Sequence, residues 1–236
     1  MTIFDAHYHV VPTEKNYNII VEGKNIIFNE LELYYEYKNK IKDSEKTTLI
    51  FDYKNNFDKI KSELIEGRLD GHKIHSRRQQ LTKLDYPKLF EHFEEIASYK
   101  KPVVIDAFYF GEDLECQPSL TAIIQFAKKF KNNTVVIAHS GGYRVLEYLQ
   151  HLRHIPNIVF ELSFSLSYLK HSSVWQDYKL LIRFADRSRI IFGTDFPYID
   201  AKDQLETFLD IATDLKIGDT DVEKMLFLNA KQIFSS

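Results

Sequence analysis

Short apolar runs alternate along this chain with longer segments in which apolar residues recur at spacings of three and four. The short runs predict strands and the longer segments predict amphipathic helices. The strands are expected at residues 2–4, 47–53, 71–75, 103–106, 134–138, 158–162 and 190–192, with a weaker candidate at 26–34. The helices are expected at residues 57–66, 87–99, 120–130, 143–152, 175–185 and 204–215. This alternation predicts βα units around a parallel sheet, and therefore a (β/α)8 TIM barrel of the α/β class.

The first 70 residues fit this pattern least well. Residues 17–28 are expected to form an extended excursion or a hairpin with Gly23 at its turn, and no clear helix separates them from residues 31–37. We therefore expect the barrel to be distorted in this part. Because no linker, internal repeat or low-complexity tract divides the sequence, residues 1–236 are expected to form a single domain.

Composition narrows the class of partner. The formal net charge of −3 and the pI near 6.3 do not provide the basic surface that a nucleic acid or an anionic membrane would require. A single cysteine, Cys116, fits a reducing compartment, and no apolar run approaches the roughly 20 residues that cross a bilayer. We expect a cytoplasmic protein that acts on a small molecule, with no nucleic acid or membrane partner. A homodimer formed through peripheral helices is compatible with such a barrel.

Candidate chemistry lies where the predicted strands end, because the functional residues of a TIM barrel collect at the carboxyl ends of its strands. His7 and His9 follow the first apolar run, and side chains alternate along a strand, so this pair presents two imidazoles on one face. That arrangement suits chelation of a divalent cation. Other predicted strands end in polar residues that would meet at the same place, namely Lys73 with His75, Asp106, His139 and Asp195.

Two further groups of residues flank this place. Glu161, Ser163 and Ser165 alternate along the seventh predicted strand, and we interpret them as lining the mouth of the barrel. Aromatic residues near the other strand ends could form an apolar wall for a ring or an acyl group. These are Tyr8, Phe108, Tyr109, Phe196 and Tyr198.

Several short motifs, taken in order, resemble the amidohydrolase superfamily, in its amidohydrolase-related branch of metal-dependent TIM-barrel hydrolases and decarboxylases. They are Asp-Ala-His-Tyr-His at residues 5–9, Lys-Ile-His at 73–75, Val-Ile-Ala-His-Ser-Gly-Gly at 136–142 and Phe-Gly-Thr-Asp-Phe-Pro at 192–197. The segment 224–234 also resembles the final helix of that family. The resemblance covers nearly the full chain.

The resemblance implies a metal centre. In it, His7 and His9 bind a divalent ion, zinc or alternatively manganese, and Asp195 is a ligand or the general base. His139 binds metal or polarises a substrate carbonyl or carboxylate. A divalent ion held by imidazoles and a carboxylate lowers the pKa of bound water to about 7, which makes hydroxide available for attack. Asp195 would accept the proton and return it to the leaving group.

The chain departs from the family pattern at the fifth strand, where a metal-binding histidine is common and Asp106 stands instead. Asp106 could serve as a carboxylate ligand, or His75 could enter the coordination shell. Some relatives carry a carbamylated lysine on the fourth strand, and Lys73 lies there. A further possibility is that catalysis needs no metal, and that Arg77 and Arg78 bind a substrate carboxylate through bidentate hydrogen bonds.

We therefore consider three hypotheses about the function of this protein. The first is a metal-dependent hydrolase of a small ester, lactone or amide, with Lys73, His75, Arg77 and Tyr109 contacting the substrate. The second is a metal-dependent decarboxylase of the same branch, which carbon dioxide release would reveal. The third is a barrel that binds a ligand without turnover.

Overall fold

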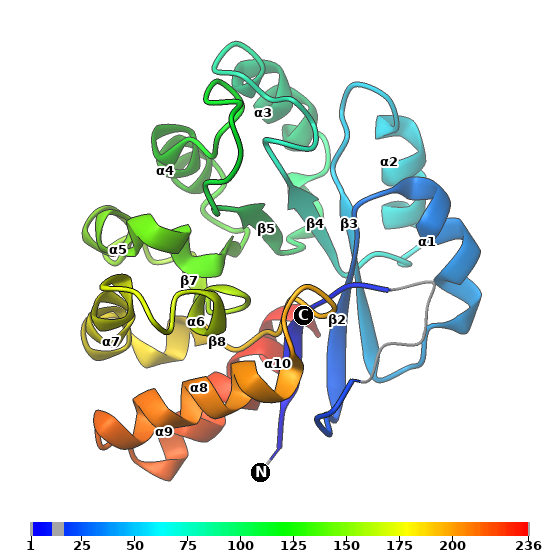
Figure 1. Ribbon diagram of the computed structural model, residues 1–236. Helices are drawn as coiled ribbons and strands as arrows, with labels where there is room; N and C mark the ends of the chain where they lie inside the picture. Colours follow the sequence, from blue (N-terminus) through cyan, green and yellow to red (C-terminus); the bar gives the residue numbers. More distant parts are fainter. Residues whose placement is uncertain (1, 11–16, 236) are drawn as a thin grey trace.

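The computed structural model describes residues 2–10 and 17–235, and these form a nearly closed barrel of eight parallel strands (Figure 1). The strands follow one another around the barrel in chain order. They are β1 (Phe4–Tyr8), β2 (Gly23–Phe28), β3 (Glu45–Ile50), β4 (Gly71–Ile74), β5 (Val103–Asp106), β6 (Val135–Ala138), β7 (Ile158–Glu161) and β8 (Ile190–Ile191). The predicted TIM barrel is confirmed.

Helices connect the strands and surround them (Figure 1). They are α1 (Leu31–Tyr37), α2 (Phe57–Ile65), α3 (Tyr86–Glu94), α4 (Leu120–Lys129), α5 (Val145–Leu152), α6 (Ser165–Tyr168), α7 (Val174–Phe184), α8 (Ala201–Asp214), α9 (Asp219–Glu223) and α10 (Asn229–Phe234). Local chemistry fixes where some of them begin. The hydroxyl of Ser119 accepts a hydrogen bond from the N–H of Ala122 at the start of α4, and the carboxylate of Asp200 accepts one from Asp203 at the start of α8. No helix among the described residues is long and apolar enough to cross a bilayer.

The barrel closes where β1 meets the segment after β8. Ala6 donates its N–H to the carbonyl of Phe192 over 3.1 Å, and Asp195 donates its N–H to the carbonyl of His7 over 2.7 Å. The buried carboxylate of Asp5 also stabilises this closure, because it accepts hydrogen bonds from the N–H and the hydroxyl of Thr194. The closure therefore sets the predicted metal-binding strand directly beside the strand end that carries Asp195.

The core fills one end of the barrel and leaves the other end for the site. Interior side chains from several strands form a buried cluster that Phe227 and Phe234 complete. Phe234 of α10 stacks on Phe4 of β1, with ring centroids 6.2 Å apart. Phe4 begins β1, so α10 covers the amino-terminal end of the strands. The residues of the candidate site lie at the opposite, carboxyl end of the strands.

The first part of the chain is more regular than the sequence suggested. Gly23 is the first residue of β2, which runs parallel to both β1 and β3, so the predicted hairpin with Gly23 at its turn is wrong. A side-chain carbon at Gly23 would lie 2.7 Å from the ring of Phe4, which shows that close packing requires the glycine there. The weak strand candidate at 26–34 was also too long, because β2 ends at Phe28 and α1 begins at Leu31.

Candidate active site

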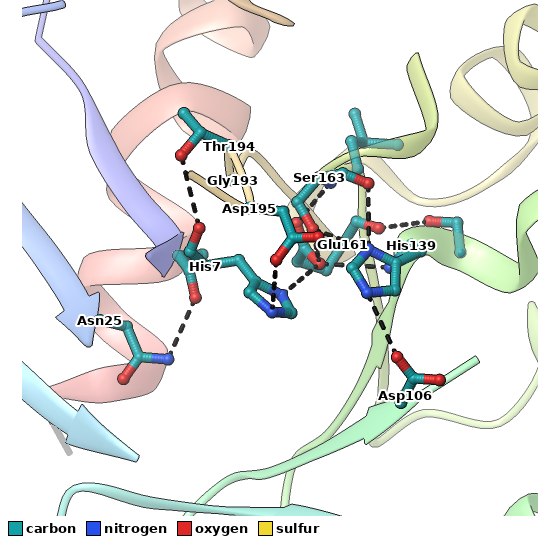
Figure 2. A network of polar contacts seen from close by, with 12 residues as sticks. His7, Asn25, Asp106, His139, Glu161, Ser163, Gly193, Thr194 and Asp195 are labelled. Atoms are coloured by element: carbon teal, nitrogen blue, oxygen red, sulfur yellow. Dashed lines mark hydrogen bonds and ion pairs between the residues drawn. The ribbon is translucent and has the colours of Figure 1, made fainter. Parts of the chain in front are cut away.

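The side chains of His7 and His9 meet that of Asp195 at the carboxyl end of the barrel. Oδ1 of Asp195 lies 3.4 Å from Nε2 of His7 and 3.3 Å from Nε2 of His9. All three side chains are buried, and Figure 2 shows His7 and Asp195 pointing toward each other from β1 and from the segment after β8. The structure thus brings together three residues that the sequence assigned to a metal site.

Hydrogen bonds on the far side of each ring decide which nitrogen faces this cluster. His9 donates from Nδ1 to the carbonyl of Ile27 over 2.8 Å, and Nδ1 of His7 lies 3.1 Å from Oε2 of Glu161. Burial lowers the pKa of His9 and, together with the nearby charge of Lys73, lowers the pKa of His7 well below its ordinary value. Neutral rings with Nδ1 protonated leave both Nε2 lone pairs available to a cation.

Glu161 organises this part of the site. Its carboxylate accepts hydrogen bonds from the N–H of His139 at 3.2 Å, from the N–H of Ser163 at 2.5 Å and from the hydroxyl of Ser163 at 2.7 Å, in addition to Nδ1 of His7 (Figure 2). Burial raises the pKa of Glu161 to about 7, against the stabilising effect of these donors. The sequence predicts for Glu161 only a place at the barrel mouth. A carboxylate directly after a fully apolar strand run, where it needs buried partners, is the signal that could have found it.

His139 is held between two carboxylate-bearing strands. Its Nδ1 faces the carbonyl and the hydroxyl of Ser163 at 3.2 and 3.0 Å, and its Nε2 lies 3.4 Å from Oδ2 of Asp106. Burial opposes a charge on this ring, but the hydrogen bond to Asp106 and the charges of Asp195 and Glu161 raise the pKa of His139 above its ordinary value. This environment favours the imidazolium, which donates from both nitrogens.

Asp106 contacts Arg77, His139 and His75 rather than the group formed by His7, His9 and Asp195. Its Oδ1 accepts a hydrogen bond from Arg77 over 3.1 Å, while Oδ2 faces His139 and lies 3.7 Å from Nε2 of His75. Within the part of the chain that the structure describes, Asp106 belongs to neither group of residues whose ligand atoms could hold a metal ion. The expectation that Asp106 replaces the missing histidine as a ligand stays a prediction, and the contacts that Asp106 makes here are with Arg77, His139 and His75.

Lys73 reaches the centre of the site from β4. Its ammonium nitrogen lies 3.1 Å from Nε2 of His7, and only 2% of the residue is exposed. Burial lowers the pKa of Lys73, an effect that the charges of Asp106, Asp195 and Glu161 oppose. His75, two residues further along the chain, lies at the wall of the cavity, and burial lowers its pKa to about 3.

The backbone is unusual at the ends of β6 and β8. His139 and Asp195 both have a φ of 61°, in the left-handed region that side chains with a Cβ rarely adopt. Gly193 precedes this turn after β8, and a side-chain carbon on it would lie 2.5 Å from Oε1 of Glu161 and 2.9 Å from Cβ of His7. Such conformations persist where the surrounding structure fixes them, and here they coincide with the candidate site.

A cavity of about 550 Å³ opens above these residues. One wall is cationic, with Lys73, Arg77 and Arg78, and another is aromatic. The residues that line the cavity are His9, Asn29, Lys73, His75, Arg77, Arg78, Asp106, Phe108, Phe110, His139, Phe164, Asp195 and Tyr198. A cavity of this size suits a small organic substrate.

Tyr109, predicted to contact the substrate, is not among the residues that line this cavity. Its ring packs 4.3 Å from the guanidinium of Arg144, and its hydroxyl donates a hydrogen bond to the carbonyl of Pro118. The neighbouring Phe108 and Phe110 face the cavity instead. Successive side chains in extended backbone point in opposite directions. Phe108 and Phe110 therefore face the cavity while Tyr109, between them, points away from it.

The donor set fits a divalent cation. The ligand atoms of His7, His9 and Asp195 all lie within 4.8 Å of one another, and two imidazole nitrogens with one carboxylate oxygen are ligands that zinc and manganese accept. A second group, His7 with His139 and Glu161, is equally compact. In this second group the carboxylate of Glu161 already accepts hydrogen bonds from His7 and His139. The first group is therefore the better candidate for a metal site.

Comparisons with known proteins agree with this picture. A family model described as Amidohydrolase matches residues 52–235 of the chain. A search of curated protein sequences gives no match.

Solved structures share the fold. An uncharacterized TIM-barrel protein from Bordetella bronchiseptica is 17% identical with a TM-score of 0.71, over 91% of this chain and 78% of that chain. A probable 2-pyrone-4,6-dicarboxylic acid hydrolase from Acinetobacter baumannii is 14% identical with a TM-score of 0.68, over 100% of both chains. A 5-carboxyvanillate decarboxylase from Sphingomonas paucimobilis is 13% identical with a TM-score of 0.64, over 91% of this chain and 79% of that chain.

Proposed function

The chain belongs to the amidohydrolase family and is an enzyme, and on that premise we propose that it is a metal-dependent hydrolase of a small ester, lactone or amide. One observation carries the proposal. The Nε2 atoms of His7 and His9 converge on Oδ1 of Asp195, at 3.4 and 3.3 Å, while hydrogen bonds on Nδ1 fix both rings in that orientation. His7, His9 and Asp195 would hold a divalent ion there, which supplies a Lewis acid and lowers the pKa of water.

Asp195 is suited to move the proton. Although burial alone would raise its pKa, the adjacent imidazole of His9 and the charges of His139 and Lys73 lower the pKa of Asp195 below its ordinary value, so the carboxylate is ionised. Oδ1 faces the two imidazoles, which leaves Oδ2 to accept a proton from the attacking water. The same oxygen would then return that proton to the leaving group.

His139 is suited to stabilise the substrate oxygen on which negative charge develops. As an imidazolium fixed through Nδ1 by Ser163, it directs Nε2–H toward Asp106 at the cavity wall, where a substrate carbonyl could compete for the hydrogen bond. The guanidinium of Arg77, 3.1 Å from Asp106, adds positive charge to that wall. This charge favours a substrate that carries a carboxylate.

A decarboxylase of the same branch is the second candidate. The cationic wall would orient a substrate carboxylate, and a protonated His139 could supply the proton that replaces it. The structural similarity to the 5-carboxyvanillate decarboxylase fits this candidate as well. Release of carbon dioxide separates the two reactions.

The test is a turnover screen of zinc-loaded and manganese-loaded protein. Esters, lactones, amides and carboxylated aromatic compounds would be compared, with acid release and carbon dioxide release both recorded. We expect acid release by the protein, and a loss of at least about 100-fold in kcat for Asp195→Asn. The control Asp58→Asn changes an exposed aspartate on α2 and should retain full activity. Carbon dioxide release, or full activity of Asp195→Asn, would contradict the hydrolase proposal.

A further inference from the structure

The side chain of Lys73 contacts the nitrogen of His7 that the proposed metal site would use as a ligand. Lys73 projects from β4 into the barrel, and its ammonium nitrogen lies 3.1 Å from Nε2 of His7. The residue is 98% buried, since its exposed fraction is 2%. This contact therefore belongs to the interior of the site.

The hydrogen bonds of His7 leave one lone pair, on Nε2, for which Lys73 and a metal ion would compete. Oε2 of Glu161 accepts from the N–H of His139 and from the hydroxyl of Ser163, both of which are donors in these contacts, so it is an acceptor toward Nδ1 of His7 as well. With the hydrogen on Nδ1, Nε2 offers a single lone pair. Lys73, whether charged or neutral, reaches it by donating an N–H. A metal ion requires the same pair of electrons.

The charges around the ammonium group explain why it lies there. Asp106, Asp195 and Glu161 are the carboxylates whose charges act on Lys73. A buried cation compensates such a group of carboxylates, which would otherwise repel one another in an interior of low dielectric constant. The side chain also lines the cavity of about 550 Å³, so it can move away from His7 without opening the core.

We propose that Lys73 is an internal cation that competes with the metal ion for Nε2 of His7, so that the site has a lysine-occupied state and a metal-occupied state that exclude each other. This inference rests on the proposed function for its metal site. Loading with metal then requires the ammonium group to leave His7. Lys73 thereby lowers the affinity of the site for a divalent ion.

The experiment measures zinc affinity by competition with a chromophoric chelator, on metal-free wild type, Lys73→Met and Lys24→Met. Lys24 is a matched control because it is half-buried on β2 and its ammonium group lies over the ring of Tyr8 rather than on a ligand. We expect Lys73→Met to bind zinc at least tenfold more tightly than wild type, and Lys24→Met to bind it equally well. Thermal unfolding of each metal-free variant establishes that it is folded.

The outcomes separate this inference from the proposed function. If wild type binds zinc and Lys73→Met binds it no more tightly, the competition is refuted while the metal site stands. If Lys73→Met alone binds zinc, the competition is supported and the metal-dependent hydrolase is contradicted for the wild-type chain. If neither binds zinc, both are refuted.

A crystal structure covers the case in which Lys73→Met does not fold. Wild-type protein would be crystallised with chelator and with zinc. We expect Nζ of Lys73 within hydrogen-bond distance of His7 in the first crystal and displaced from it in the second. A lysine nitrogen that coordinates the zinc, or that carries a carbamate, would overturn the proposal.

Discussion

Nδ1 of His7 lies 3.1 Å from Oε2 of Glu161, and both side chains are almost fully buried. The contact links β1 to β7 across the barrel and determines which nitrogen of His7 faces Asp195. Partners of this kind orient ligating histidines and raise their basicity. Glu161 is therefore as much a part of the candidate site as the residues that the sequence predicted.

Replacing Glu161 with glutamine should weaken the metal site. Oε2 accepts from His7, His139 and the hydroxyl of Ser163, and Oε1 accepts from the N–H of Ser163; in glutamine one of these two positions becomes an amide nitrogen, which cannot accept. We expect zinc affinity to fall about 10- to 100-fold. Chelator competition measures this, with the exposed Glu112→Gln as the control. Unchanged affinity in Glu161→Gln would show that the hydrogen bond to His7 does not support the site.

Gly193→Ala should disturb the same contact from the side of β8. The added carbon would lie 2.5 Å from Oε1 of Glu161 and 3.0 Å from the backbone nitrogen of His7, so one of them must move. We expect a loss of about 1–3 kcal/mol in the free energy of unfolding, measured with urea. Gly218→Ala is a close control, because nothing lies within 4 Å of its added carbon. Equal stability of the two variants would contradict the tight packing.

Arg77→Met should weaken binding of carboxylates without affecting neutral compounds of the same shape. Arg77 lines the cavity and contributes charge to its wall. We expect benzoate to bind about tenfold more weakly to the variant, since a charged hydrogen bond contributes about 1.5–3 kcal/mol, while benzamide binding stays constant. Calorimetry measures both, with the exposed Arg183→Met as the control. An equal loss for benzoate and benzamide would indicate a change of cavity shape instead.

A carboxylate far from the site should produce a pH-dependent part of the stability. Burial would raise the pKa of Glu63, but hydrogen bonds from Arg68 and Tyr34 and the charge of Lys38 lower the pKa to about 2 from the ordinary 4.5. Its contribution is therefore complete above pH 4.5 and is lost as the pH falls toward 2.

Urea unfolding of Glu63→Gln checks this sign. At pH 7 we expect the variant to be about 2 kcal/mol less stable than wild type, with most of the difference gone near pH 2. Glu36→Gln, which changes an exposed residue of α1, should match wild type at both pH values. A difference that grows in acid would have the wrong sign and would refute the assignment.

The sequence predicted those features that depend on local patterns. The alternation of apolar runs is visible residue by residue, so the barrel and most strand positions followed from it. The spacing of His7 and His9 placed both rings on one face because the strand geometry alone decides that. Their roles and that of Asp195 as metal ligands stay predictions, which the structure makes more specific by bringing the three together.

Other features depend on contacts between distant residues, which no local pattern encodes. Gly23 is explained by the ring of Phe4 and not by a turn. Asp106 turns toward Arg77 and His139 from other strands, and Tyr109 turns toward Arg144. A residue type at a strand end can therefore be predicted, but the partner that it selects depends on packing.

The most direct test of the account is the metal content of the purified protein. Wild type, His7→Ala/His9→Ala and the control His151→Ala/His154→Ala, which changes two exposed histidines, would be incubated with zinc, passed through a desalting column and measured by mass spectrometry of the metal. We expect near-stoichiometric zinc in wild type and in the control, and almost none in the His7/His9 double variant. Equal zinc in all three proteins, or none in any, would contradict a metal site at His7, His9 and Asp195.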